Sequence, residues 1–325
     1  MSLRYLLTRL FIGIGVMWGV VTLVFLLLRL APGDPARLIL GPSATAEQVE
    51  AQRHQLGLDR PVVEQYGAWL SRVARGDLGT SIATGRPVGA MLAEAWPATA
   101  LLVSLSLLLS YVLGILLALV QADASGTKVD TGLSIASVTL YAMPSYWLAV
   151  VLVLVFAYWW RVFPAFGAQG LDAEFLSPAG RLGDRLRHLA LPLITLTLIG
   201  IGGIARYVRG SLVDLQGSQF LTVARAKGLS RRAVLLRHAL PNALIPVLIL
   251  LGLSLPALFS GAVFVEAIFA WPGVGRLLVT AVQARDYPVV LAATTISAAL
   301  VVLGSLLADG LVAMADPRLR DAVDA

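Results

Sequence analysis

Long apolar segments alternate with polar segments along the whole chain. A hydrocarbon core about 30 Å thick needs about 20 apolar residues in a helix. Six segments of that length occur, near residues 9–30, 98–120, 133–159, 189–208, 243–268 and 289–313. The pattern predicts an all-α integral membrane protein with six transmembrane helices, so that both ends of the chain lie on one side of the membrane.

Glycine and proline residues change what is expected of the apolar segments that contain them. Gly200, Gly202 and Gly203 interrupt the fourth segment. Small residues let membrane helices approach closely, so we interpret these glycines as a packing face and not as a break. Proline removes a backbone hydrogen bond and predicts a bend. Four prolines lie within or at the edges of apolar segments: Pro144, Pro192, Pro246 and Pro256.

The first long polar segment, residues 31–96, has the pattern of a folded loop. Thr45 and Gln48 have the spacing of a capping box, and Gly57 is placed to end the helix that follows. Asp59 is expected to cap a second helix, which Gly76 closes. That helix carries an apolar stripe of Val62, Tyr66, Trp69, Leu70 and Val73. The stripe is expected to form a small local core, and its alternative role is a docking surface for an extracytoplasmic partner.

A second polar segment, residues 219–241, is short and basic, and it separates two apolar segments. Phe220, Val223 and Ala224 have helical spacing, and Gly228 comes where a left-handed residue would end that helix. Ser230 is placed to cap a second helix, which leads to Pro241. We therefore predict a helix, a glycine elbow and another helix.

Small and basic residues give this elbow two alternative roles. Ala224, Ala226 and Gly228 would let its backbone lie close to the surface of another protein. Positive charges surround it, on Arg225, Lys227, Arg231, Arg232 and Arg237. A basic loop lying on anionic lipid headgroups would have the same composition. The residues alone leave both roles open.

Charge placement predicts the orientation in the membrane. The basic residues from Arg225 to Arg237, together with Arg4 and Arg9, favour the cytoplasm for the 210–242 loop and for both termini. The apolar part of residues 1–30 is too long for the core of a cleaved signal peptide. It is expected to remain attached as the first membrane helix. The polar loop at 31–96 is then extracytoplasmic.

Composition narrows the chemistry. The chain has 325 residues, of which 58% are hydrophobic and 14% charged, with a net charge of +6 and no cysteine. Disulfides, thiolate metal sites and cysteine nucleophiles are therefore excluded. The basic residues lack the interleaved aromatics of a nucleic-acid surface.

Catalytic motifs are absent from the sequence as well. It contains no phosphate-binding loop, no His-Glu-x-x-His and no Gly-x-Ser-x-Gly, and His54, His188 and His238 are scattered. We predict no catalytic residue, no metal site and no cofactor in this chain. Any nucleotide energy is then expected to come from a partner.

Three ionisable residues lie within or beside apolar segments: Arg9, Glu266 and Asp309. A charge in lipid is costly, so each is expected to be paired or hydrated near an interface. A proton-coupled secondary transporter would place a carboxylate near the middle of a span, and none lies there. This weakens the alternative of a transporter or channel working alone. A membrane scaffold without transport activity is the other alternative.

Several motifs carry a resemblance to a known family. The positions Thr222, Val223, Ala224, Gly228, His238, Leu240 and Pro241 align with the cytoplasmic coupling segment of type I ABC importer permeases. The general pattern of that segment begins with Glu-Ala-Ala. It is matched at four positions, which are Ala224, Gly228, Leu240 and Pro241. Thr222, Val223 and His238 depart from it. Those departures resemble the dipeptide/oligopeptide (and nickel) permease branch of the binding-protein-dependent importers.

Further motifs of that branch follow in order along the chain. They are Gly33-Asp34-Pro35, Leu56-Gly57-Leu58-Asp59-Arg60-Pro61, Arg75-Gly76-Asp77-Leu78-Gly79-Thr80-Ser81, the glutamate and glycine motif from Val265 to Gly275, Ala284 to Pro288, and Asp316-Pro317-Arg318. The resemblance implies a type I ABC importer transmembrane domain at residues 94–314. It also implies an appended helix and extracytoplasmic loop at 1–93 and a cytoplasmic tail at 315–325.

The resemblance also implies a function and partners. The chain would be a permease subunit that moves peptides, paired with a homologous second permease, two ATP-binding subunits and an extracytoplasmic peptide-binding protein. ATP and magnesium would be bound by the ATPase subunits. Relatives of this branch carry dipeptides, longer peptides, glutathione or nickel, and no residue here discriminates among them. The residues implied in coupling to the ATPase are Phe220, Thr222, Val223, Ala224, Arg225, Ala226, Lys227, Gly228, Leu229, Ser230, Leu240 and Pro241.

Overall fold

The computed structural model describes residues 3–30, 33–41, 43–254 and 262–315, and within these ranges the regular structure is helical. The helices are α1 (Leu3–Leu30), α2 (Pro35–Leu40), α3 (Ala46–Gln55), α4 (Val62–Ala74), α5 (Val88–Asp123), α6 (Lys128–Ala142), α7 (Ser145–Leu152), η1 (Val153–Trp159), η2 (Ala173–Phe175), α8 (Pro178–Leu215), α9 (Gln219–Ala226), α10 (Arg231–Val234), η3 (Leu235–Ala239), α11 (Leu240–Ala243), α12 (Ile245–Ser254), α14 (Val263–Ile268), α15 (Val274–Gln283) and α16 (Tyr287–Ala315). The all-α prediction is confirmed for these residues. The motif at 316–318 lies outside them.

Four of the described helices are long and apolar enough to cross a membrane, namely α1, α5, α8 and α16. The bent pair of α6 with α7 and η1 would make a fifth. The predicted span at 243–268 falls on α12 and α14, and the residues between them, with Pro256, lie outside the described ranges. A multi-pass membrane protein is therefore confirmed, and the count of six spans stays a prediction.

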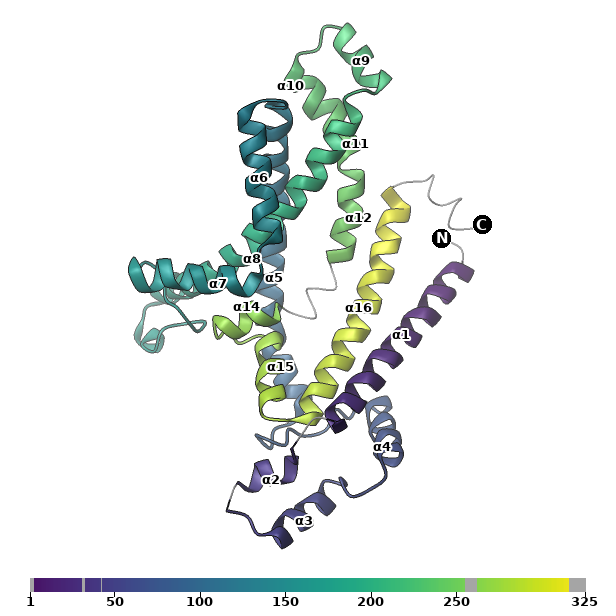
Figure 1. Ribbon diagram of the computed structural model, residues 1–325, viewed down its shortest axis with the longest axis vertical. Helices are drawn as coiled ribbons and strands as arrows, with labels where there is room; N and C mark the ends of the chain where they lie inside the picture. The colour runs from purple at the N-terminus through teal and green to yellow at the C-terminus, as the bar shows by residue number, and fades with distance from the viewer. Residues whose placement is uncertain (1–2, 31–32, 42, 255–261, 316–325) are drawn as a thin grey trace.

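A sharp bend divides the segment predicted as a span at 133–159, and its crossing of the membrane stays a prediction. α6 ends at Ala142, and α7 leaves Pro144 at an angle of 103° to it, so that α7 projects sideways from the bundle (Figure 1). Met143 has the extended backbone that a following proline favours. The bend predicted at Pro144 is confirmed, whereas α8 continues as one helix through Pro192.

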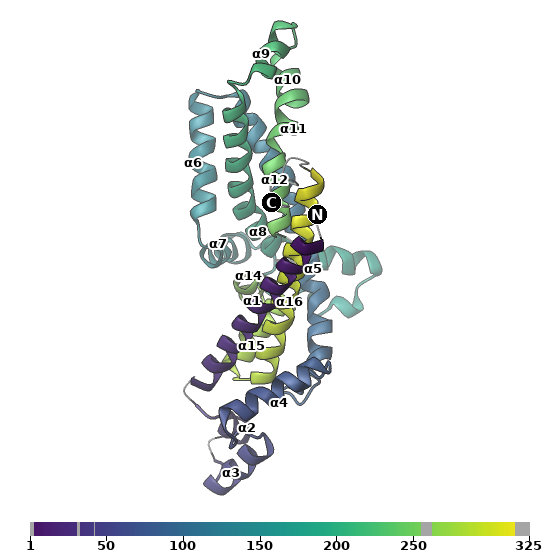
Figure 2. The ribbon, with the colours of Figure 1, turned by 90° about the vertical axis from the view of Figure 1, so that its right-hand side faces the viewer.

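The glycines of α8 form the packing face that their spacing predicted. A methyl group on Gly202 would lie 2.5 Å from the carbonyl oxygen of Ser137 and 2.8 Å from the nitrogen of Tyr141, both in α6. A methyl group on Gly200 would overlap Ser110 of α5. On the α5 side, Gly114 lies against Ile204 in the same way. α8 is therefore in close contact with both neighbours (Figure 2).

The loop at 33–87 confirms most of its predicted local structure. Thr45 and Gln48 form a capping box, and Gly57 and Gly76 have positive φ angles of 64° and 80°. The prediction that Asp59 caps α4 is wrong. Pro61 occupies the position before α4 without a side-chain hydrogen bond, and Asp59 instead lies 2.9 Å from His54 Nδ1.

The apolar stripe of α4 is a core contact, although its partners differ from the prediction of a local core. Trp69 is buried, and its ring lies 6.1 Å from that of Phe25 in α1. Tyr66 meets Phe25 edge to face at 5.0 Å, and Leu291 of α16 completes the cluster. α4 is thus fastened to the two membrane helices that converge at this end of the molecule (Figure 1).

Two motifs that are far apart in the sequence meet at the same end. Asp286, which is buried, accepts hydrogen bonds from the hydroxyl of Ser81 and from the nitrogens of Ile82 (3.0 Å) and Ala83 (3.3 Å). Arg285 lies against Gly33, where any side chain would overlap its guanidinium. These motifs therefore join the loop to the start of α16.

The glycine face of α8 generates a stability prediction. Gly202→Ala should lower the apparent melting temperature, because overpacking of a tight contact costs about 1–3 kcal/mol. Gly210→Ala in the same helix is the matched control, since nothing lies within 4 Å of its added methyl. This control should be neutral or stabilising by about 0.5–1 kcal/mol from helix propensity. Tryptophan fluorescence of the detergent-solubilised protein during heating measures both, and equal melting temperatures would contradict the packing assignment.

Candidate functional site

The helix, elbow and second helix predicted for the basic segment are present. α9 ends at Ala226, Gly228 has a φ of 80°, and the Ser230 hydroxyl accepts a hydrogen bond from the nitrogen of Ala233 at 3.3 Å. The elbow lies at one extremity of the molecule, opposite α2, α3 and α4 (Figure 1). The local signals of the sequence were sufficient here because each acts within four residues.

α9 has two different faces, and their division corrects one expectation. Leu221 and Ala224 are buried in a cluster with Leu212 of α8 and Val234 of α10. Ala224 therefore serves this chain's own packing and cannot sink into another protein. The exposed apolar residues of α9 are Phe220 and Val223, at 42% and 53% exposure.

The other predicted coupling residues divide in a similar way. Exposed positions are Thr222, Arg225, Ala226, Lys227, Gly228, Leu229, Ser230 and Pro241. Leu240 is partly buried and packs beneath α9 in the same cluster as Leu221. A methyl group on Gly228 would meet no atom of this chain within 4 Å. The outer surface of the elbow is thus open around Gly228 and carries Phe220 and Val223, whereas Leu229, at 36% exposure, also borders a pocket on the inner side of α9.

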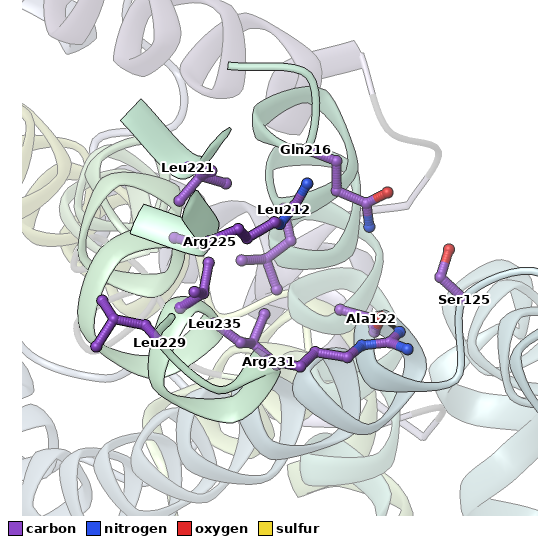
Figure 3. A pocket seen from close by; sticks show the side chains of 11 residues that line it. Ala122, Ser125, Leu212, Gln216, Leu221, Arg225, Leu229, Arg231 and Leu235 are labelled. Carbon is purple, nitrogen blue, oxygen red and sulfur yellow. Dashed lines mark hydrogen bonds between the residues drawn. The ribbon is translucent and has the colours of Figure 1, made fainter. Parts of the chain in front are cut away.

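A pocket of about 460 Å³ lies behind α9, between α10 and the ends of α5 and α8 (Figure 3). Leu212, Leu221 and Leu235 form its apolar wall, and the side chains of Arg225 and Arg231 border it. The pocket therefore separates part of the inner side of α9 from the end of α8, and α9 packs chiefly on α10 and η3.

Arg231 fastens the elbow to α5. Its Nη2 donates to the main-chain oxygen of Asp123 at 2.6 Å, and its Nε lies 3.3 Å from the Asp123 carboxylate. The main-chain oxygens at the end of a helix carry partial negative charge and lack helical partners. Arg231, which the sequence placed only among the surrounding charges, is thus a specific link to the end of α5.

Pro241 explains the irregular helix that follows the elbow. Proline cannot donate a backbone hydrogen bond, and its ring crowds the preceding turn. The turn at Leu235–Ala239 is accordingly a π-helix, in which the nitrogen of Leu240 bonds to the oxygen of Leu235. Asn242 Nδ2 donates to the oxygen of His238 at 2.7 Å. The role of Asn242 in satisfying this carbonyl depends on the π-turn and had no signal in the sequence.

An ion pair that the sequence did not indicate joins α6 to α8 near the elbow. Arg209 donates from Nε and Nη2 to the two carboxylate oxygens of Asp130, both at 2.8 Å. Asp130 is buried, and paired two-point contacts of this kind are among the stronger ones. The residues are 79 positions apart. The one local signal in the sequence concerned the start of α6, where the side chain of Thr127 accepts a hydrogen bond from the nitrogen of Asp130.

The three ionisable residues singled out from the apolar segments all have partners. Arg9 Nε lies 3.2 Å from Asp309, which confirms that these two residues pair. Glu266 is fully buried and accepts hydrogen bonds from the Thr99 hydroxyl (3.0 Å) and from the nitrogens of Ala262 (3.1 Å) and Gly275 (2.7 Å). Its carboxylate organises the turn between α14 and α15 and holds it against α5.

Comparison with known proteins places these features in a family. Residues 110–321 match the family described as "Binding-protein-dependent transport system inner membrane component", and residues 2–103 match its N-terminal companion, "Binding-prot-dependent transport system membrane comp, N-term". The oligopeptide transport system permease protein AppB of Bacillus subtilis (strain 168) is 37% identical over 317 residues, which cover 97% of this chain and 99% of AppB. The di/tripeptide transport system permease protein DppB of Pseudomonas aeruginosa (strain UCBPP-PA14) is 36% identical over 332 residues, covering 98% and 99%.

The link between Arg231 and α5 generates a second prediction. Arg231→Ala should speed amide hydrogen exchange in residues 218–234 by about twofold to fivefold, because an exposed charge-assisted bond contributes modestly. Asp123→Asn should change exchange little, since the main-chain oxygen that Arg231 binds is still present. Exchange measured by mass spectrometry on the detergent-solubilised chain decides this. Equal effects of the two variants would show that the link is an ordinary surface ion pair.

Proposed function

The chain belongs to the family of binding-protein-dependent transport system inner membrane components, and we propose from this membership that it moves di- and oligopeptides across the cytoplasmic membrane. Like its relatives, it is a permease subunit and not an enzyme. The names of AppB and DppB support peptides as the substrate class. The similarity extends over nearly the full length of this chain and of each relative, and it therefore supports the same role for the whole protein.

The coupling site is the exposed surface of the elbow, formed by Phe220, Val223, Gly228 and Leu229. A separate ATP-binding subunit docks on it. The observation that carries this assignment is the left-handed Gly228 beside exposed apolar residues, because no described residue lies within 4 Å of a methyl group added there. Large exposed apolar groups beside basic residues are typical of a protein contact.

Three routes connect this surface to the membrane helices. Leu221 and Ala224 belong to an apolar cluster that includes Leu212 of α8, and Arg231 binds the end of α5. The third route is the nearly continuous helical path from α10 through η3 and α11 into α12. ATP binding and hydrolysis in the partner would favour different arrangements of the bundle, and these contacts would carry the shift.

The remaining assignments follow from the same family role. A homologous second permease completes the pathway, two subunits bind ATP and magnesium, and an extracytoplasmic protein delivers the peptide. The elbow and both termini face the cytoplasm, and the α2–α4 loop faces outward. The chain has six spans, with a transport domain at 94–314 preceded by an appended helix and loop at 1–93 and followed by a tail at 315–325.

The third prediction tests the elbow in the assembled transporter. Gly228→Val should leave the chain in the membrane and abolish peptide stimulation of ATP hydrolysis, because its side chain would separate the docked surfaces. Gly228→Asn should do the same. Asparagine tolerates the left-handed backbone, so its effect reports contact and not strain. The measurement is ATP hydrolysis by proteoliposomes with and without peptide and binding protein.

Gly126 provides the matched control for this experiment. It also has a left-handed backbone, with a φ of 82°, and nothing lies within 4 Å of an added methyl. It lies in the turn after α5, at the same end of the molecule. Gly126→Val should keep peptide-stimulated hydrolysis, although it bears the same backbone strain. Normal peptide uptake by Gly228→Val would contradict the assignment of the elbow as the coupling site.

A further inference from the structure

A second and larger pocket lies at the end of the molecule opposite the elbow. Its volume is about 740 Å³. The end of α1, helices α3 and α4, the segment at 77–82 and the start of α16 enclose it. None of its lining residues belongs to the coupling surface, so its chemistry needs a separate explanation.

The charges in this pocket are strongly unbalanced. Four arginines line it: Arg29, Arg60, Arg72 and Arg75. None of them forms an ion pair with a carboxylate in residues 3–30, 33–41, 43–254 and 262–315. The one carboxylate of the lining is Asp77, which accepts a hydrogen bond from the nitrogen of Gly79 at 2.9 Å. The pocket is therefore a site of concentrated positive charge.

Arg29 is the most informative of the four. It is partly buried, and its guanidinium lies over the rings of Phe25 at 5.1 Å and Tyr287 at 5.5 Å. Both rings orient the guanidinium through cation–π contacts. A partly buried charge without an anionic partner is costly. A bound anion would remove that cost, and a phosphate group matches the geometry of guanidinium donors.

The position of the pocket points to the source of the phosphate. Arg29 lies at the last turn of the α1 span, and Tyr287 begins the α16 span, so the pocket adjoins the ends of two apolar helices. Trp69, Phe25 and Leu291 provide apolar walls beside the arginines. Exposed Leu26, Leu27 and Leu30 cover the neighbouring surface of α1. Aromatic and basic residues at this level are typical of headgroup contacts.

We propose that this pocket binds the phosphate headgroup of an acidic phospholipid, with the acyl chains lying along the end of α1. A soluble phosphate would share the arginine chemistry but would not use the adjoining leucines. The lipid would bridge α1, α4 and α16 and so hold the loop to the membrane helices. This role is independent of the coupling surface and of the transported substrate.

Native mass spectrometry of the purified full-length chain in neutral detergent tests the proposal. The probes are short-chain phosphatidylglycerol, short-chain phosphatidylcholine and inorganic phosphate. Phosphatidylglycerol should bind saturably and in preference to phosphatidylcholine. Arg29→Gln with Arg72→Gln should weaken its binding at least about tenfold, since each arginine near a headgroup contributes on the order of 1 kcal/mol. The double variant Arg72→Gln with Arg75→Gln should weaken it too and leaves α1 intact.

Arg185→Gln with Arg187→Gln is the charge-matched control, because both residues are exposed and lie in α8, outside the pocket. This control should bind phosphatidylglycerol within about twofold of the unmodified chain, since distant exposed charges contribute little. Unchanged binding in the folded Arg72→Gln and Arg75→Gln variant would overturn the proposal. Displacement of the lipid by equimolar inorganic phosphate would overturn the lipid as the source.

Discussion

The close approach of α8 to α5 and α6 is the constraint on which the rest of the structure depends. Gly202 lies against the backbone of α6, whereas Gly200 lies against Ser110 of α5 and Gly114 of α5 against Ile204 of α8, so a methyl group at any of the three would overlap its neighbour. Lipid tails are as apolar as the surfaces of the helices, so the hydrophobic effect does not bring helices together within a membrane. Close packing of this kind holds the bundle together instead. Because α8 is fixed this way, its far end presents Arg209 to Asp130 and Leu212 to α9.

The elbow depends on that fixed end and adds short-range links of its own. Leu221 and Ala224 pack into an apolar cluster formed by α8, α10 and η3, and Arg231 reaches the last carbonyl oxygens of α5. The π-turn before Pro241 then carries the chain into α12. The outer surface carries Phe220, Val223 and Gly228, and no described residue lies within 4 Å of a methyl group added to this glycine. The inner side of α9 packs against this chain, and its outer side is an exposed apolar surface. These two requirements together explain the mixture of apolar and small residues in the elbow.

Local chemistry was predictable and long-range pairing was not. The Gly228 elbow, the Ser230 cap and the Thr45 capping box act within four residues, so spacing alone revealed them. Asp59 had an equally good capping signal, but Pro61 determines where α4 begins. Spacing also grouped Ala224 with Phe220 and Val223. Only the packing of α9 into the cluster with α8, α10 and η3 decides that Ala224 faces inward. The contacts of Asp130 with Arg209 and of Asp286 with Ser81 join distant segments and had no signal in one sequence.

The two faces of α9 can be distinguished directly, because the chain contains no cysteine. Val223→Cys and Ala224→Cys each introduce one thiol, whose reaction with a maleimide can be timed in the isolated permease and in an assembly with the proposed ATP-binding subunits. The account predicts that the thiol at 223 reacts rapidly in the isolated chain and is protected in the assembly. The thiol at 224 should react slowly in both. Equal reactivity at 223 in the two states would contradict the central claim that this surface receives the ATPase.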